Sequence, residues 1–415
     1  MGTTHTCLSG LDRETSSTTN RSRNIGLALL QQSTQQYRPD EGGHAELHRA
    51  AGAAGAAVAV AGSDRVCVQE GSLEASLRDI MAAVLRGLPR WPDTSAGPTE
   101  VESPVLAFVV QVAYEDKLLL LARVFSKIYT PGDVFVYLVD SAMLDPARVR
   151  AALPTPLPDN VFVRSAQHAT YFYWPKEQVL LDGLAKTLEQ HWDFVLHMSE
   201  SDYPVHSVQW LRRFLGKHRQ RSYITLVPKC SADPQQPSSG SWSWWDQKWA
   251  VASCESAFEP KEVQGVRYPM QELEGHGFKF ANAPEWIILT RELVQYAVQP
   301  SLVHFRRMIG MHAATDEIFW GTLVLNIPGF QQSVGHQSWF VHWSKLHGSH
   351  PDTLTKQHLP MILQDRQRIF FMRKVTEADS KGLMDELDRL METPDVNAQD
   401  LDVEDSPWDF NATAC

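Results

Sequence analysis

The sequence has few cysteines, and the five that are present are scattered over 415 residues. No two of them form a Cys-x-x-Cys pair, and their number is too small for a disulfide-stabilised scaffold. Cys230 and Cys254 lie in one region. They form a disulfide bond in an oxidising compartment or remain two free thiols, and the sequence leaves both alternatives open.

Long hydrophobic runs are also missing. No segment approaches the roughly 20 apolar residues that a membrane-spanning helix needs. The longest candidate, residues 50–62, is short and consists of small residues without a preceding basic region. It therefore does not resemble a signal peptide, and the sequence itself identifies neither an anchor nor a leader.

An excess of positive charge is the third absence. The formal net charge is -11, so we expect no binding to nucleic acid through a broadly basic surface. The chain is instead rich in tryptophan, with 13 residues. Tryptophan rings stack on sugar faces and also fill ordinary cores. This count is compatible with carbohydrate binding but does not establish it.

Composition divides the chain into three regions. Residues 1–102 are dominated by small and polar residues and predict a mostly disordered region and linker with one helix, at 73–88. Residues 103–390 have the composition of a globular domain. Residues 391–415 predict an acidic disordered tail.

Within the central region, apolar strand-like runs alternate with segments of helical periodicity. Strands are expected at 105–112, 133–140, 160–165, 193–198, 222–227 and 285–290, with a short apolar run at 366–374. Helices are expected at 117–127, 175–190, 208–218, 291–310, 316–325 and 377–390. This alternation predicts an α/β fold with a mostly parallel sheet flanked by helices.

Two acidic positions lie where such sheets bind ligands, beyond the carboxyl ends of strands. Asp140 ends one strand, where it can bind a nucleotide or cap a helix. Glu200 and Asp202 follow another strand with the spacing of a divalent-cation site. A tight turn before Pro204, stabilised by Asp202, is the favoured alternative, so we expect no metal ligand here.

Further charged residues begin one predicted helix and end one predicted strand. Asp316 and Glu317 start the helix, where acids are common because the helix dipole favours them. A carboxylate at this place can also act as a general base. Arg373 and Lys374 end an apolar run. They are solvated strand-end charges or the cations that bind a diphosphate leaving group.

Four stretches, in order, resemble the core-2/I-branching enzyme family, or glycosyltransferase family 14. They run from residue 106 to 140, from 193 to 205, from 285 to 326 and from 341 to 375. The family includes peptide O-xylosyltransferases, β-1,6-N-acetylglucosaminyltransferases and plant glucuronosyltransferases. The resemblance implies a GT-A-like fold, inversion at the anomeric carbon and no requirement for a metal cofactor.

The resemblance also implies roles for individual residues. Glu317 matches the catalytic base, and Asp140, Asp202, Arg373 and Lys374 match donor-binding positions. Two tryptophans match positions near the acceptor and the sugar, namely Trp286 and Trp174. Glu200 departs from the small or neutral residue expected at its place, which keeps a metal bound by Glu200 and Asp202 as an alternative.

The expected reaction is transfer of a sugar from a UDP-sugar to a hydroxyl group of a protein or glycan. The final motif favours a protein O-xylosyltransferase that uses UDP-xylose and a serine hydroxyl. The alternatives are N-acetylglucosaminyl or glucuronosyl transfer onto glycans, or a non-catalytic relative that binds glycans or nucleotides. The family implies a membrane-associated enzyme in the lumen of the Golgi or endoplasmic reticulum, although the sequence contains no signal for this location.

Overall fold

The computed structural model describes residues 73–92, 103–169, 174–228, 251–252, 260–261, 273, 275–310, 312, 314–330, 332–335, 339–344 and 350–392. Several predictions fall outside these residues. They are the disorder expected before residue 73, the acidic tail beyond residue 392 and the pairing of Cys230 with Cys254.

A seven-stranded sheet forms the centre of the domain, with the strand order β12-β6-β11-β4-β1-β2-β3. The strands are β1 (Leu106–Val112), β2 (Val134–Asp140), β3 (Val161–Ala166), β4 (Phe194–Ser199), β6 (Arg221–Tyr223), β11 (Ile288–Thr290) and β12 (Ser333–Gly335). Pairs β1–β2, β1–β4, β2–β3 and β6–β12 are parallel. Strand β11 is antiparallel to both of its neighbours, β4 and β6, so it runs against the rest of the sheet.

Side chains of the buried strands point alternately to two hydrophobic cores, one on each face of the sheet. Val109 and Val136 belong to the first core, whereas Phe108 and Phe135 belong to the second and stack with ring centroids 4.9 Å apart. Both faces are therefore buried. This explains why β1 and β2 are continuous apolar runs without alternating polar residues.

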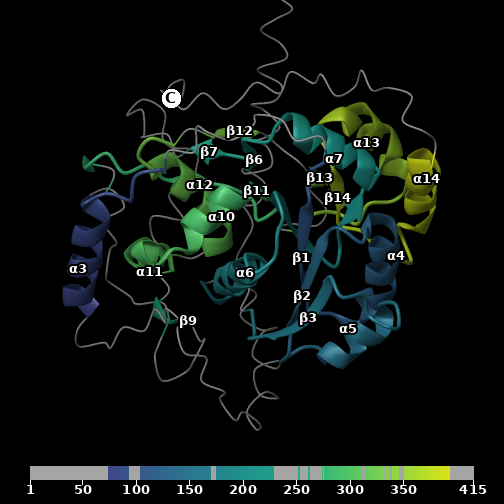
Figure 1. Cartoon of the computed structure of the whole chain (residues 1–415), viewed down its shortest axis with the longest axis horizontal. Helices are drawn as coiled ribbons and strands as arrows, with labels where there is room; N and C mark the ends of the chain where they lie inside the picture. Colours follow the sequence, from purple (N-terminus) through teal and green to yellow (C-terminus); the bar gives the residue numbers. More distant parts are fainter. Residues whose placement is uncertain are drawn as a thin grey trace, which may run out of the picture.

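Helices cover both faces, as Figure 1 shows. The first core is covered by α3 (Leu73–Leu85), α6 (Trp174–Thr187), α10 (Arg291–Val298), α11 (Val303–Gly310) and α12 (Thr315–Asn326). The second is covered by α4 (Leu118–Ile128), α5 (Pro146–Ala152), α7 (Val208–Lys217), α13 (Leu359–Asp365) and α14 (Lys381–Glu392). The predicted α/β architecture with a mostly parallel sheet is confirmed.

Several predicted elements differ in extent: the strands expected at 222–227 and 285–290 are only three residues long, and α14 begins four residues later than predicted. The helix expected at 291–310 is divided between α10 and α11, because Pro300 forces the preceding Gln299 into an extended conformation (φ -63, ψ 146). The run at 366–374 contains only the short strand β14 (Phe371–Arg373), after a 3-10 turn at Arg366–Arg368.

Helix α3 confirms the one helix expected in the first 102 residues, and it packs on α11 at one edge of the molecule (Figure 1). Ile80, Met81 and Val84 belong to the first core, as does Trp91, which follows the helix. Residues 73–92 therefore share a core with the domain that composition alone started at residue 103.

A second, three-stranded sheet lies beyond the carboxyl end of β4, with the strand order β13-β14-β5. Its strands are β5 (Tyr203–Pro204), β13 (Trp339–Val341) and β14. β13 runs parallel to β14, and β5 runs antiparallel to it. This sheet fixes Arg373 beside the turn that follows β4.

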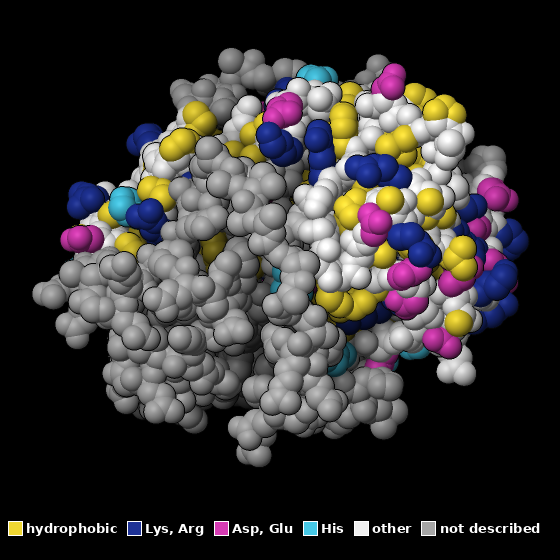
Figure 2. Space-filling view, turned by 90° about the horizontal axis from the view of Figure 1, so that it is seen from below, with side chains coloured by type: hydrophobic (Ala, Val, Ile, Leu, Met, Phe, Trp, Pro, Cys, Tyr) yellow, Lys and Arg dark blue, Asp and Glu magenta, His cyan; other side chains and the backbone are white. Residues whose placement is uncertain are grey.

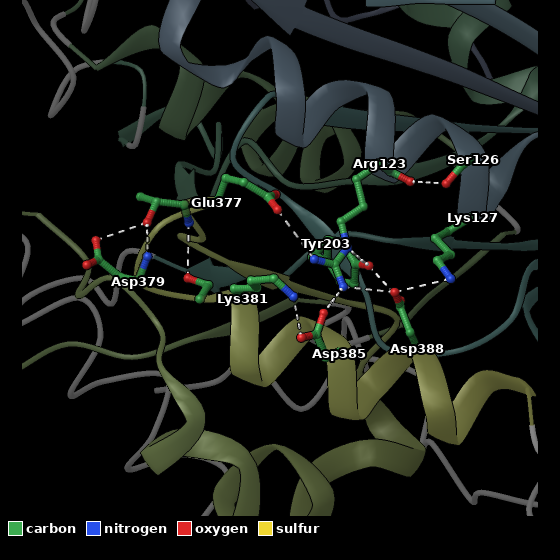
Figure 3. A network of polar contacts seen from close by, with 11 residues as sticks. Arg123, Ser126, Lys127, Tyr203, Glu377, Asp379, Lys381, Asp385 and Asp388 are labelled. Atoms are coloured by element: carbon green, nitrogen blue, oxygen red, sulfur yellow. Dashed lines mark hydrogen bonds and ion pairs between the residues drawn. The ribbon is translucent and has the colours of Figure 1, made fainter.

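Helix α14 is attached to this small sheet by a network around Arg123 of α4 (Figure 3). Arg123 Nη2 donates to Asp385 (2.7 Å) and to Asp388 (2.9 Å), and its Nε donates to the Tyr203 hydroxyl (3.0 Å). Tyr203 in turn donates to Asp388 (2.6 Å). One guanidinium group thus connects α4, β5 and α14.

Replacing Arg123 by methionine is expected to lower the free energy of unfolding by about 1.5–3 kcal/mol, because it removes hydrogen bonds to charged groups on a side chain that is 18% exposed. Urea unfolding measures the change. Lys381→Met is the matched control, since its pair with Asp385 is exposed and exposed ion pairs contribute little to stability. Equal losses of unfolding free energy in both variants would show that the Arg123 network adds no more stability than an exposed ion pair.

Charged side chains of both signs are intermingled on the described surface in Figure 2, together with scattered hydrophobic side chains. The described part of this face shows no continuous basic patch. Within the described ranges, no helix has the length and hydrophobicity needed to cross a membrane.

Candidate active site

The candidate site lies where several chain segments end or begin at one edge of the main sheet. β4 ends here at Ser199, and β11 starts nearby because it runs in the opposite direction. Glu285 and Trp286, which lie shortly before β11, therefore reach the same edge of the sheet as the turn after β4. The first turns of α6 and α12 contribute Lys176, Asp316 and Glu317.

Arg373, at the end of β14, is the central cation of this edge. Its Nη1 lies 3.5 Å from Asp202 Oδ1 and 3.7 Å from Glu285 Oε1. Its guanidinium carbon lies 4.4 Å from the ring centre of Trp286, a cation–π contact. Among the described residues, buried atoms Nε and Nη1 of Arg373 have no hydrogen-bond partner. These donors are unused in a position where buried donors are normally satisfied.

Asp202 stabilises the turn after β4, as the sequence predicted. Its Oδ2 accepts a hydrogen bond from the Ser199 amide at 2.7 Å, and the side chain is fully buried. Burial raises the pKa of Asp202, and the nearby Arg373 opposes that effect. One carboxylate oxygen is thus used within the turn and the other faces Arg373.

Lys374 follows Arg373 at the edge of the small sheet. Burial, and then the charge of Arg373, lower the pKa of Lys374. Its backbone pairs with the segment of Asp352, since the Leu354 amide donates to the Lys374 carbonyl at 2.8 Å. Asp352 itself accepts from Ser344 and contacts His342, each at 2.7 Å. Buried Asp352 therefore holds the backbone on which both cations lie.

Glu285 and Lys176 form a close ion pair in the site and were not identified from the sequence. Lys176 Nζ lies 2.5 Å from Glu285 and 2.9 Å from Asp316. Burial alone would raise the pKa of Glu285, but Lys176, Arg373 and His197 together lower it to about 2. Glu285 is therefore the ionised acid that connects Arg373 to Lys176.

Glu317 is half-buried in the first turn of α12, and the local sequence explains its position. Gly321 allows α12 to approach Ala281 of β10 (Ala281–Asn282), because an added Cβ would lie 3.1 Å from the Ala281 carbonyl oxygen. The Glu317 carbonyl accepts from the Ala283 amide at 2.6 Å. Burial, and then the adjacent Asp316, raise the pKa of Glu317 to about 8.

Asp140 is buried at the carboxyl end of β2, two strands away from β4 in the sheet. Two strand spacings correspond to roughly 10 Å. Its carboxylate accepts from the amides of Ala142 (3.0 Å) and Ala169 (3.1 Å) and contacts His168 Nδ1 at 2.9 Å. The structure thus places Asp140 on the same edge of the sheet as Asp202 but in a separate group of contacts.

The two tryptophans predicted near the acceptor and the sugar have different environments. Trp286 is partly exposed and stacks with Arg373, inside the site. Trp174 is only 6% exposed and packs against Gly310 and Phe319 in the first core. The ring of Trp174 therefore presents almost no surface to a ligand in this structure, and its role near the sugar stays a prediction.

Glu200 is half-buried beside Asp202, and burial raises its pKa to about 7. Within the described residues, no group of three or more His, Cys, Asp or Glu side chains is arranged to hold a metal ion. Asp202 faces the cation Arg373 instead. The alternative of a cation bound by Glu200 and Asp202 therefore receives no support from a surrounding ligand set.

A continuous series of contacts connects the predicted residues. Arg373 contacts Glu285, Glu285 contacts Lys176, and Lys176 contacts Asp316, the neighbour of Glu317. The site thus has a cation with unused donors at one end and a carboxylic acid of raised pKa at the other. Such a pair can bind a phosphate-bearing leaving group and accept a proton from a hydroxyl group.

This edge of an α/β sheet thus carries an acid in the first turn of one helix and two successive cations at a strand end. The family model described as Core-2/I-Branching enzyme matches residues 106–366, more than half of the chain. The chain therefore belongs to this family.

A curated relative is xylosyltransferase 2 of Rattus norvegicus, which is 20% identical over 235 residues, or 50% of this chain and 24% of that protein. The chain thus matches about a quarter of that relative's length. Two solved structures are distantly similar. The apo structure of WbbM, a bifunctional glycosyltransferase, has a TM-score of 0.35 at 9% identity and covers 72% of this chain and 51% of that one.

The second solved structure is a mannose-1-phosphate geranyltransferase from Thermus thermophilus, with a TM-score of 0.21 at 9% identity, over 50% of this chain and 68% of that chain. Both scores are too low to specify a donor or an acceptor. The family match therefore carries the assignment.

Proposed function

We propose that this protein is a glycosyltransferase that transfers a sugar, with inversion, from a UDP-sugar to an acceptor hydroxyl group, and that UDP-xylose and a protein serine are the favoured pair. The observation that carries the proposal is Arg373, a buried guanidinium group whose Nε and Nη1 make no hydrogen bond to the described residues and which Glu285 and Lys176 connect to the helix of Glu317. The weak similarity to xylosyltransferase 2 supports the choice of xylose.

In the proposed mechanism, ionised Glu317 accepts the proton of the acceptor hydroxyl. The hydroxyl oxygen attacks C1 of the sugar from the face opposite the nucleotide, and the bond between C1 and the phosphate oxygen breaks. UDP leaves with the bonding electron pair. Arg373 and Lys374 stabilise the negative charge that develops on its diphosphate, a role that buried, preorganised donors perform well.

Other residues position the two substrates. Asp140 accepts hydrogen bonds from the nucleotide, and Asp202 holds the turn that orients Arg373. Trp286 offers its partly exposed ring to the acceptor. Since two cations meet the diphosphate, the proposed reaction needs no divalent metal. We also propose the membrane-associated, lumenal location that is expected for the family.

A panel of donors tests this proposal. UDP-xylose, UDP-N-acetylglucosamine and UDP-glucuronate are each incubated with the protein, with and without EDTA, and release of UDP is measured. We expect release from UDP-xylose to exceed the others and to be insensitive to EDTA. Preference for another sugar would change the assigned donor, and loss of activity in EDTA would favour a metal at Glu200 and Asp202.

The competing interpretation is a non-catalytic relative that binds nucleotides or glycans. UDP would then raise the thermal unfolding temperature of the protein without release of UDP from any of the three sugars. Intact Glu317, Arg373 and Lys374 favour the enzyme, because a binding protein has no use for a base beside the acceptor.

A further inference from the structure

Lys176 occupies an unusual position for a cation. It lies in the first turn of α6, where the helix dipole disfavours positive charge, and its side chain is only 12% exposed. Two buried carboxylates compensate for this cost, Glu285 at 2.5 Å and Asp316 at 2.9 Å. Lys176 therefore connects the donor side of the site, where Glu285 meets Arg373, to the helix that carries Glu317.

Asp316 is the second component. It is 5% exposed, one of its oxygens binds Lys176, and the other, Oδ1, has no hydrogen-bond partner among the described residues. It directly precedes Glu317 in the first turn of α12. A neighbouring negative charge on Asp316 disfavours ionisation of Glu317, whereas the cation Lys176 favours it.

Groups from every surrounding element face this pair of acids. Those that interact with Asp316 or Glu317 are Lys176 and Glu177 of α6, Glu285 before β11 and Asn282 of β10; His197 of β4 and Arg373 of β14 interact with Glu285. Glu177 is 1% exposed, and burial, then Asp316, raise its pKa well above the ordinary value. The acids outnumber the cations in this cluster, so each cation has a large effect on the acids beside it.

We propose that Asp316 and Lys176 are opposing positioning residues that set the protonation of the general base, with Asp316 keeping the proton on Glu317 and Lys176 promoting its loss. This inference rests on the proposed role of Glu317. It assigns functions to two side chains that touch neither the leaving group nor the acceptor. The ion pair between them keeps both charges beside the base.

The consequence is measurable as the pH dependence of kcat/KM. Glu317 must be ionised to accept a proton, so activity falls as the pH drops below its pKa. Burial and then Asp316 raise that pKa, and Lys176 lowers it. Asp316→Asn removes a negative charge and is expected to move the acid limb of the kcat/KM profile to lower pH, by about 1 unit. Lys176→Met removes a cation and is expected to move the same limb to higher pH, by about 1 unit.

Three further variants make the test specific. Lys176→Arg keeps the charge and is expected to return the acid limb of the pH profile towards its wild-type position. A purely structural role of Lys176 would not produce this return. Glu189→Gln removes an exposed acid that pairs with Lys186, away from the site, and should leave the limb in place. Glu317→Gln establishes separately whether Glu317 is the base.

The outcomes distinguish the inference from the proposed function. Opposite displacements of the limb support the inference. Displacements in one direction, or lower activity with an unmoved limb, overturn it even if Glu317→Gln is inactive. Near-normal turnover of Glu317→Gln would instead refute the base assignment itself, whatever the other variants do.

Discussion

Replacing Glu317 by glutamine is expected to lower kcat by roughly 10²–10⁴-fold and to leave UDP affinity nearly unchanged. Glutamine has almost the same shape but cannot accept the proton of the acceptor. In the proposed function UDP is held at the other end of the contact series, by Arg373 and Lys374. Single-turnover kinetics and calorimetric titration of UDP measure the two quantities independently.

A matched control is available in Glu292, which also lies in the first turn of a helix, α10, but outside the site. Glu292→Gln makes the same chemical change with the same helical position. We expect wild-type turnover for this variant. Turnover by Glu317→Gln within a few-fold of wild type would mean that another group, or water, takes the proton.

The second large effect is expected for Arg373→Met. We expect kcat/KM to fall by roughly 10²–10³-fold, because the leaving diphosphate loses a preorganised donor. The substitution also leaves Asp202 buried without its cation, which is expected to cost about 3–5 kcal/mol of unfolding free energy. Enzyme kinetics and denaturant unfolding measure these two effects.

The double variant Arg373→Met/Asp202→Asn separates the two effects. It removes the unpaired buried charge, so stability should recover while UDP affinity stays low. Arg368→Met, at an exposed cation shortly before β14, is the control for loss of a charge near this strand. Recovery of UDP affinity in the double variant would show that Arg373 acts only through folding and does not bind the diphosphate.

Much of the fold was predictable because strong local signals agree with the tertiary structure. The runs at 105–112 and 133–140 form β1 and β2 almost to the residue, since strands buried on both faces must be apolar throughout. Asp140, Glu317 and Arg373 could be predicted as site residues because each is a charged residue that interrupts or ends an apolar pattern at the end of a strand or helix.

Glu285 was missed because its place in the site depends on the direction of a strand. Parallel sheets bind ligands beyond the carboxyl ends of their strands, so the sequence pattern points to acids that follow a strand. Glu285 precedes β11, which is antiparallel to β4 through pairs such as Ile288 with Leu196. A three-residue strand gives no local sign of its direction, so only long-range pairing brings Glu285 to Arg373.

Lys176 and Trp174 show the opposite limits of local reasoning. A lysine in the first turn of a helix contradicts the usual preference for acids there, and that anomaly was a usable signal of a special environment. Nothing local distinguishes Trp174 from an exposed tryptophan. Its burial follows from the arrival of Gly310 and Phe319, which lie far later in the sequence.

The connection of Arg123 to α14 has a consequence for biosynthesis. Arg123 is separated from Asp388 by 265 positions and from Asp385 by 262, and Tyr203 is separated from Asp388 by 185. Such distant partners close only after nearly all of the domain has left the ribosome, since loops of this length form late. A nascent chain can therefore complete β1, β2 and their helices early, yet β5 of the small sheet gains its contact with α14 only when that last helix has docked.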